Sequence, residues 1–184
     1  MKFTSSCSFI LALLHIQYGQ ASETMEPKIV NLGPINIVGV QVVGSPADGS
    51  FGKTWPVLFE RNSELPSRIG MNVSYGVQSY SQELMKQGKW KYTAGLEVSE
   101  KENIPAGMAL ISIPSSQYAV FEYKGVISPE LGQFFQHIYK KWLPESGYVI
   151  EGKYDFERYD SRFKGPANPD SVLDIYLPIK KPRI

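Results

Sequence analysis

The segment Tyr154–Tyr159 (YDFERY) alternates acidic and aromatic side chains along an expected strand. Because successive strand residues point to opposite faces, Asp155, Glu157 and Tyr159 share one face. A carboxylate beneath aromatic rings is poorly hydrated, so an organic cation that binds beside it supplies a counter-charge while burying its own apolar body. Glu157 is therefore a candidate partner for a cationic ligand. The competing interpretation is a solvent-facing Glu157 paired with a lysine.

Aromatic residues make up 12% of the chain, which is high for a domain of this size and indicates either a binding cavity or an aromatic core. Aromatic walls would hold a cation by their ring faces, at about 0.5–2 kcal/mol for each contact. Tyr159 and Trp90 are the strongest candidates, because Tyr159 shares a face with Glu157 and Trp90 begins a strand after a polar loop. The other candidates are Trp55, Phe59, Tyr75, Tyr92, Tyr118, Phe135 and Trp142.

Other kinds of chemistry find little support in the sequence. Cys7 is the single cysteine, and with only His15 and His137 beside it the chain cannot assemble a structural zinc site from Cys and His alone. No Gly-x-Ser-x-Gly elbow, P-loop or His-Glu-x-x-His motif occurs. The sequence therefore predicts no nucleophile, no metal site and no cofactor.

The first half of the domain contains Val- and Ile-rich runs and one segment with helical spacing of apolar residues. Pro56 lies in that helical segment, and because proline is tolerated in a first turn but not in a helix interior, the helix is expected to start near Thr54. Two strand-like runs around a short polar stretch favour a hairpin. The expected elements are a strand over 28–44, a helix from about 54 to 62, and hairpin strands over 71–80 and 90–99.

The second half contains the clearest helix of the chain. Ser128 is its expected N-cap, Pro129 takes the first helical position, and Pro144 with Gly147 ends it. Its apolar face is formed by Leu131, Phe134, Phe135, Ile138 and Trp142. Strands are expected over 108–125, 148–160 and 171–180.

The order of the elements is strand, helix, strand, strand, and then the same again. This order predicts an α+β fold of duplicated βαββ units, related by a pseudo-two-fold axis, with an antiparallel sheet and both helices packed on one face. No residue-by-residue repeat is visible, so the duplication rests on element order alone. The groove between the two halves is the expected ligand site.

Length and charge narrow the class of protein. A chain of 184 residues is expected to form one globular domain, placed at residues 25–184. With 19 Lys and Arg residues against 18 Asp and Glu residues, the net charge is +1, and no basic block marks a surface for nucleic acid or anionic lipid. Direct binding of nucleic acid or of a membrane is therefore not expected.

Residues 1–24 form a leader with two interpretations. The apolar run from Phe9 to Ile16, followed by small residues, is typical of a secretory signal cleaved after Ala21, and it is too short to span a bilayer. Alternatively, translation starts at Met25 and the protein is cytoplasmic. We favour the start at Met25, because everything that resembles a domain follows it.

Several segments together resemble the GyrI-like effector-binding domain, the family that includes the ligand-binding halves of AraC-type and BmrR-type regulators. The resemblance covers about Lys28 to Lys181. Each segment alone is weak evidence for the family, whereas their order and spacing together are fairly specific to it. The segments are IVGVQVVGS (37–45), YTAGLEVS (92–99), IPAGM (104–108), QYAVFEYKG (117–125), KKWLPESGY (140–148), DFERYD (155–160) and LDIYLPIK (173–180).

The resemblance implies a duplicated βαββ fold and a pocket for organic, often cationic and aromatic, molecules. It also implies that Glu157, within Phe156-Glu157-Arg158-Tyr159, is the acidic group that faces the pocket. Regulators of the family carry a DNA-reading domain, and the 24 residues before this fold are too few to form one. The expected function is a stand-alone protein that senses or sequesters a ligand.

Two alternatives remain open beside this expectation. In the first, Glu157 acts as a general base in a small-molecule hydrolase, since burial can raise the pKa of a carboxyl toward neutrality. In the second, the chain modulates a protein partner, such as a transcription factor or a topoisomerase.

Overall fold

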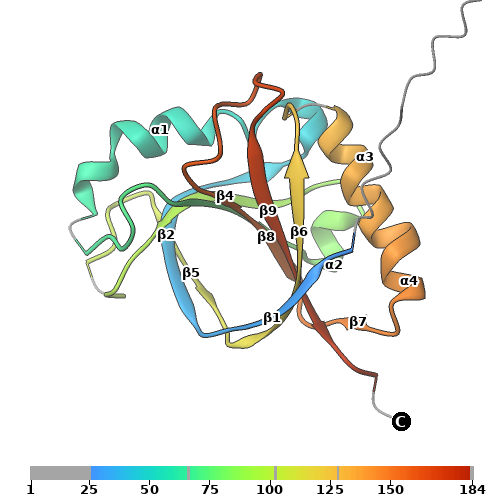
Figure 1. Ribbon diagram of the computed structural model, residues 1–184. Helices are drawn as coiled ribbons and strands as arrows, with labels where there is room; N and C mark the ends of the chain where they lie inside the picture. Colours follow the sequence, from blue (N-terminus) through green and yellow to red (C-terminus); the bar gives the residue numbers. More distant parts are fainter. Residues whose placement is uncertain (1–25, 66, 102, 128, 183–184) are drawn as a thin grey trace, which may run out of the picture.

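The computed structural model describes residues 26–182 except 66, 102 and 128, and these residues form a nine-stranded sheet with helices packed against it (Figure 1). The leader and the expected N-cap Ser128 lie outside the described residues. The strands are β1 (Lys28–Leu32), β2 (Ile35–Gly44), β3 (Ser74–Ser79), β4 (Trp90–Glu97), β5 (Ala109–Ile113), β6 (Ser116–Lys124), β7 (Val149–Ile150), β8 (Tyr154–Tyr159) and β9 (Val172–Lys180). The helices are α1 (Thr54–Glu60), α2 (Gln82–Met85), α3 (Pro129–His137) and α4 (Leu143–Glu145), with short 3-10 turns at Pro46–Asp48 and Asn62–Glu64.

The sheet is antiparallel throughout, in the order β1-β6-β9-β8-β3-β4-β2-β5, with β7 added beside β9. This arrangement confirms the predicted α+β class. The chain divides into two units, β1-β2-α1-β3-β4 and β5-β6-α3-β8-β9, which follow the same path. Each unit therefore has one more strand at its start than the βαββ unit predicted from the sequence.

The duplication extends to the strand registers. Strand β5 begins 81 residues after β1 (109 minus 28). Adding 81 to the number of Lys28 and subtracting 81 from that of Val120, its partner, gives Ala109 and Gly39, which are also a pair in the sheet. At the centre of the sheet Gly76 pairs with Glu157, and these two residues also differ by 81 (157 minus 76). They are therefore both neighbours and counterparts, and the pseudo-two-fold axis passes between them.

The two units exchange their first strands. Strand β1 of the first unit pairs with β6 of the second, and β5 of the second unit pairs with β2 of the first. Strands β3 and β8 then join the units at the centre. Each unit consequently leaves backbone hydrogen-bonding groups unpaired unless the other unit is present.

Three expected strands prove to be interrupted. The strand predicted over 28–44 is divided into β1 and β2 at Gly33-Pro34, and the strand predicted over 108–125 is divided into β5 and β6 at Pro114. Proline has no backbone N–H to donate to a neighbouring strand, and each of these two prolines lies where the chain leaves one partner strand for another. The strand predicted over 148–160 is broken at Gly152, whose positive φ of 95° ends the pairing of β7 before β8 begins.

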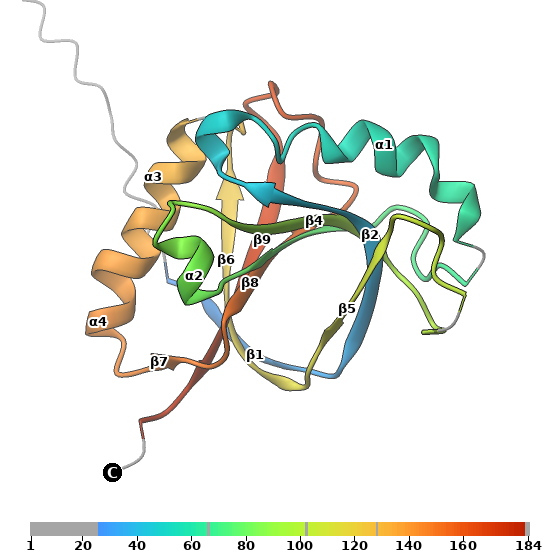
Figure 2. The same ribbon diagram turned by 180° about the vertical axis from the view of Figure 1, so that it is seen from behind.

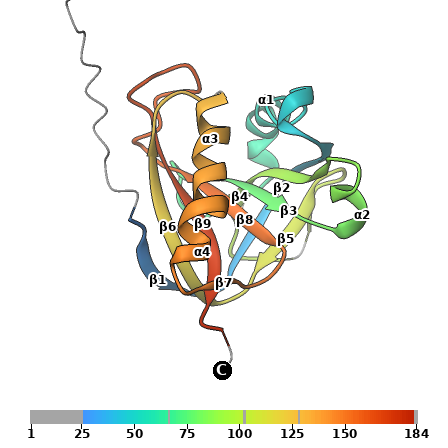
Figure 3. The same cartoon turned by 90° about the vertical axis from the view of Figure 1, so that its right-hand side faces the viewer.

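The predicted hairpin of β3 and β4 and the two predicted helices are present. Pro56 lies in the first turn of α1, and α1 ends at Glu60, before a 3-10 turn. Helix α3 continues through a π-helical turn, Ile138–Trp142, into α4, so one helical rod runs alongside β6 and β9 (Figure 3). A π-helical turn inside an α-helix commonly marks a functional position.

Both helices pack on one face of the sheet, as predicted. Helix α3 covers Phe121 and Ile175 of the second unit, and α1 places Leu58 against Tyr92 and Leu96 of the first unit. The opposite face is enclosed because the sheet curls, with β1, β2 and β5 bending around it (Figures 1 and 2). Its core is formed by Ile37, Tyr75, Val77, Ile113, Tyr118 and Phe156.

Candidate functional site

A pocket of about 1060 Å³ lies between the two helices and the central strands of the sheet. This volume is large enough for a drug-sized molecule. Seven of the ten residues singled out from the sequence line it, and they come from α1, α3, β4 and β8. These residues are Trp55, Phe59, Trp90, Tyr92, Phe135, Glu157 and Tyr159.

Glu157 lies at the centre of the site, on β8 beside the pseudo-two-fold axis. The residue is 5% exposed, and its Oε2 accepts hydrogen bonds from the hydroxyls of Tyr159 at 2.7 Å and Tyr92 at 3.3 Å. Within the described residues it forms no ion pair. Its charge therefore has only neutral hydroxyl partners.

Burial raises the pKa of Glu157 to about 7, because the ionised carboxylate loses its hydration. The hydrogen bonds from Tyr159 and Tyr92 oppose this rise, and the nearby charge of Asp155 adds to it. A carboxylate in this position gains from any ligand that brings a positive charge into the pocket.

Gly76 provides the space for this carboxylate. It pairs with Glu157 across β3 and β8, and a Cβ atom at position 76 would collide with Oε2 of Glu157 and with the hydroxyl of Tyr92. The duplication is thus asymmetric at its axis: the second unit carries an acid where the first unit carries no side chain.

Asp155 is a second buried carboxylate on the same face of β8. It is 0% exposed, and its Oδ2 accepts hydrogen bonds from Tyr80, at 2.8 Å, and from Tyr139. Its Oδ1 has no hydrogen-bond partner among the described residues. Burial raises the pKa of Asp155 to about 6, against the effect of the two tyrosine hydroxyls.

A continuous series of aromatic rings borders the pocket. Neighbouring rings in the series have centroids 4.5–5.9 Å apart, except for Tyr92 and Trp55 at 6.5 Å. These spacings lie within or close to the usual range for interacting aromatic pairs. In order, the rings belong to Tyr80, Trp90, Phe51, Tyr92, Trp55, Tyr159 and Phe163.

Three of the residues singled out from the sequence do not line this pocket. Tyr75 and Tyr118 belong to the core on the opposite face, where Tyr75 donates to Glu97 at 2.8 Å and Tyr118 meets the Tyr154 hydroxyl at 2.8 Å. Strand alternation explains Tyr75, which is adjacent to Gly76 and must point away from the pocket. Trp142 packs on Phe121 with ring centroids 4.9 Å apart, beyond the pocket along the helical rod.

Several pocket residues escaped the sequence analysis. Tyr80 follows β3 directly, Tyr139 lies in the π-helical turn, and Phe51 precedes α1. Asp155 shares the face of Glu157 and was given no role from the sequence; it does not itself line the pocket, but its hydrogen-bond donors Tyr80 and Tyr139 do. Phe163 comes from the β8–β9 connection, and no local pattern places a loop residue in a pocket.

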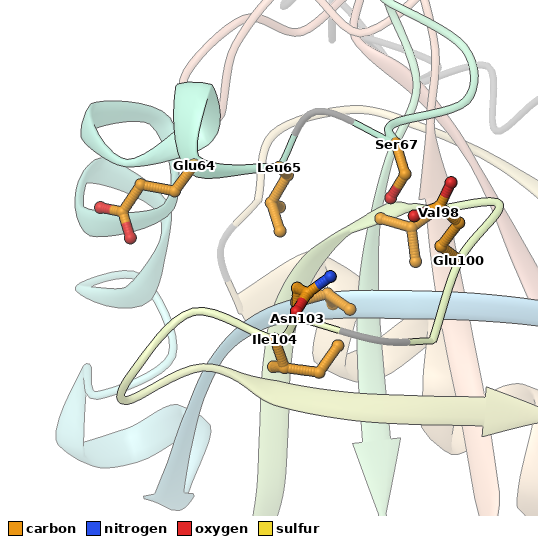
Figure 4. Close-up of a pocket in the computed structure, with 8 residues that line it drawn as sticks. Glu64, Leu65, Ser67, Val98, Glu100, Asn103 and Ile104 are labelled. Carbon is orange, nitrogen blue, oxygen red and sulfur yellow. The ribbon is translucent and has the colours of Figure 1, made fainter.

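A second hollow lies below the 3-10 turn that follows α1, between Leu65 and Ile104 (Figure 4). It measures about 50 Å³, which is room for water and not for an organic molecule. Within the described residues, no group of three or more His, Cys, Asp or Glu side chains is arranged to hold a metal ion. In that same part of the chain, no helix has the length and apolar character needed to cross a membrane.

Comparison with known proteins agrees with this architecture. The model of a family described as the GyrI-like small molecule binding domain matches residues 25–180. The chain belongs to this family. The match confirms the resemblance found from the sequence segments, and it shows that this GyrI-like domain is a module for binding small molecules.

One relative matches the chain in sequence, and two solved structures match it in fold. The transcriptional regulator BrlR of Pseudomonas aeruginosa is 36% identical over 155 residues, which are 84% of this chain and 56% of BrlR, so the chain spans about half of that relative. The structure of SAV2435 bound to tetraphenylphosphonium has a TM-score of 0.66 at 18% identity, covering 85% of this chain and 94% of the other. A hydrolase from Listeria innocua has a TM-score of 0.52 at 14% identity, covering 85% and 92%. At these identities the two structures show the shared fold.

Proposed function

We propose that this GyrI-like domain binds amphipathic organic cations, with Glu157 as the counter-charge and the aromatic rings as walls, and that it senses or sequesters them. The observation that carries the proposal is the carboxylate of Glu157, buried in a large pocket with tyrosine hydroxyls as its partners. Burying an ionised group without an opposite charge is unfavourable, and a bound cation removes that penalty.

The walls of the pocket suit the apolar part of such a ligand. Trp55 and Tyr159 stand edge to face at 5.0 Å, and Phe51 stacks on Tyr92 at 4.5 Å. Ring faces attract cations, and this attraction grows when water is excluded. Phe59 is 52% exposed while it lines the pocket, which places it at the entrance.

Tetraphenylphosphonium and tetraphenylborate test the proposal, because the two ions have nearly the same shape and opposite charge. We expect the wild-type protein to bind the phosphonium and to discriminate against the borate. In the Glu157→Gln variant, affinity for the phosphonium should fall by about tenfold or more, since the electrostatic attraction between the phosphonium and the carboxylate is lost. Isothermal titration calorimetry measures both affinities.

The matched control is Glu83→Gln, which removes an exposed carboxylate on α2, away from the pocket. It should leave both affinities unchanged. Equal binding of the two ions by the wild type, or an unchanged phosphonium affinity in Glu157→Gln, would contradict the proposal.

A hydrolytic function is the second candidate, favoured by one observation. The pKa of about 7 of Glu157 is suited to a general base at neutral pH, and two tyrosine hydroxyls stand beside it. Incubation with a reactive ester or a strained cyclopropane compound separates the two functions: turnover beyond one equivalent supports a hydrolase, whereas stoichiometric binding supports a sensor.

The relation to BrlR adds a proposed role for ligand binding. BrlR is a transcriptional regulator, and this chain matches about half of it. We therefore propose that the domain, with a ligand bound, could also modulate a protein partner such as a transcription factor or a topoisomerase.

A further inference from the structure

We propose that Asp155, which lies behind the pocket residues Tyr80 and Tyr139, forms a second charge subsite, and that the ligand class of the whole site is an elongated aromatic dication. One cationic group of the ligand lies beside Glu157, and the second, which carries N–H donors, lies beside Asp155. The inference rests on the proposed function, because it takes Glu157 as the first subsite.

The first argument is the unsatisfied oxygen of Asp155. This side chain is fully buried, and both of its hydrogen-bond donors, Tyr80 and Tyr139, act on Oδ2. Its Oδ1 has no partner in the described part of the chain. Buried polar atoms in folded proteins are nearly always paired, and exceptions call for an explanation such as a missing ligand. An N–H group of a ligand would satisfy Oδ1.

The second argument is the charge of the site. Among the described residues, the groups that donate hydrogen bonds to the two carboxylates are the hydroxyls of Tyr80, Tyr92, Tyr139 and Tyr159, which come from the residue after β3, from β4, from the π-helical turn and from β8. Neither carboxylate forms an ion pair with a Lys, Arg or His among the described residues. A ligand with one positive charge neutralises half of the charge that two ionised carboxylates bring, whereas a dication neutralises all of it.

The third argument is spacing. Asp155 and Glu157 are two residues apart on the same face of β8, a repeat of about 7 Å along a strand. The aromatic series connects their tyrosine partners: Tyr80 meets Trp90 at 5.9 Å, Trp90 meets Phe51 at 5.6 Å, and Phe51 stacks on Tyr92 at 4.5 Å. An aromatic ligand that lies along these rings extends from one carboxylate toward the other.

The tyrosines control access to the second subsite. Tyr80 and Tyr139 line the pocket, and Asp155 lies behind them. A ligand group reaches Oδ1 when one of these side chains turns aside. Quaternary cations lack N–H donors, so the second subsite selects amidinium, guanidinium or protonated amine groups.

Two amidines test this inference: benzamidine carries one amidinium group, and benzene-1,4-dicarboxamidine carries one at each end of the same ring. We expect the wild-type protein to bind the diamidine at least about tenfold more tightly, which corresponds to one added charge-assisted hydrogen bond. In the Asp155→Asn variant this preference of the diamidine over benzamidine should disappear.

The control is Asp170→Asn, which removes an exposed carboxylate that forms an ion pair with Lys124 and should retain the preference. A wild-type protein without the preference, or an Asp155→Asn variant that keeps it, would overturn the second subsite. Failure of the proposed function is a separate result: it would appear as unchanged phosphonium affinity in the Glu157→Gln variant.

A measurement on the wild type covers the case in which Asp155→Asn does not fold. Titrations at pH 6 in two buffers of different ionisation enthalpy give the number of protons released on binding. The diamidine should release more protons than benzamidine, because both carboxyl groups must ionise to receive it. Equal proton release would count against the inference.

Discussion

For Glu157 and Asp155, the effect of pH on the free energy of unfolding is opposite to that of an ion-paired carboxylate. An ion-paired carboxylate has a lowered pKa and stabilises the folded state as pH rises. Here burial raises the pKa of Glu157 from 4.5 to about 7, so the folded protein binds more protons than the unfolded chain between these values. The free energy of unfolding therefore falls as pH rises through this window, and the ligand-free pocket is held at a cost in stability.

Replacement of Glu157 by Gln should remove this dependence on pH. We expect Glu157→Gln to gain stability over the wild type as pH rises, from little difference near pH 4.5 to about 3 kcal/mol at pH 8. Urea denaturation of both proteins at pH 5 and pH 8 measures this difference; Asp155 is present in both and largely cancels. A difference that is the same at the two pH values would show that Glu157 ionises normally in the folded state.

At the scale of the elements, the connection between β8 and β9 completes the pocket. Phe163 of this connection packs edge to face on Tyr159 at 4.8 Å. The preceding Arg162 donates to Asp160, Glu122 and Asp174, and its hydrogen bonds hold the pKa of Asp160 at about 2. Arg162 therefore fixes the start of a loop that carries one wall of the ligand site.

The Arg162→Ala variant tests this positioning role. Arg162 is partly exposed, so its ion pairs should contribute only about 1 kcal/mol to stability. We expect faster hydrogen exchange of the amides in residues 161–171 and a several-fold weaker affinity for tetraphenylphosphonium. Lys124→Ala, which removes an exposed ion pair to Asp170 in the same loop, is the control and should change neither. Unchanged exchange in Arg162→Ala would show that the loop is held by its apolar contacts.

The sequence predicted the elements better than it predicted the pocket. Alternation in β8 placed Asp155, Glu157 and Tyr159 on one shared face, and helical spacing found α1 and α3. The same local patterns cannot tell which face of a strand borders a hollow, because both faces of this curled sheet are buried. Tyr118 was misplaced for that reason. The tyrosines around Asp155 come from three separate segments, and only the folded chain brings them together.

At the scale of the whole molecule, the duplication is visible in the strand registers but not in the identity of the side chains. An offset of 81 residues relates the strand pairs of the two units, yet the positions at the axis are Gly76 and Glu157. A symmetric pair of acids there would place two carboxylates against each other, and the collision expected for a side chain at position 76 shows that there is no room for a second. The function proposed for the site therefore depends on the divergence of the two units.

The exchanged strands make the two units one cooperative structure. Without β5, strand β2 loses one of its two neighbours, and without β1, strand β6 does the same; the pairing of β3 with β8 is lost as well. We expect that fragments obtained by dividing the chain after Lys101 do not fold separately, since each would expose unpaired strand edges and half of the pocket. Thermal melts followed by circular dichroism measure this. Full-length protein should unfold in a single transition, and a fragment that melted cooperatively by itself would show that the central pairing joins two independent domains.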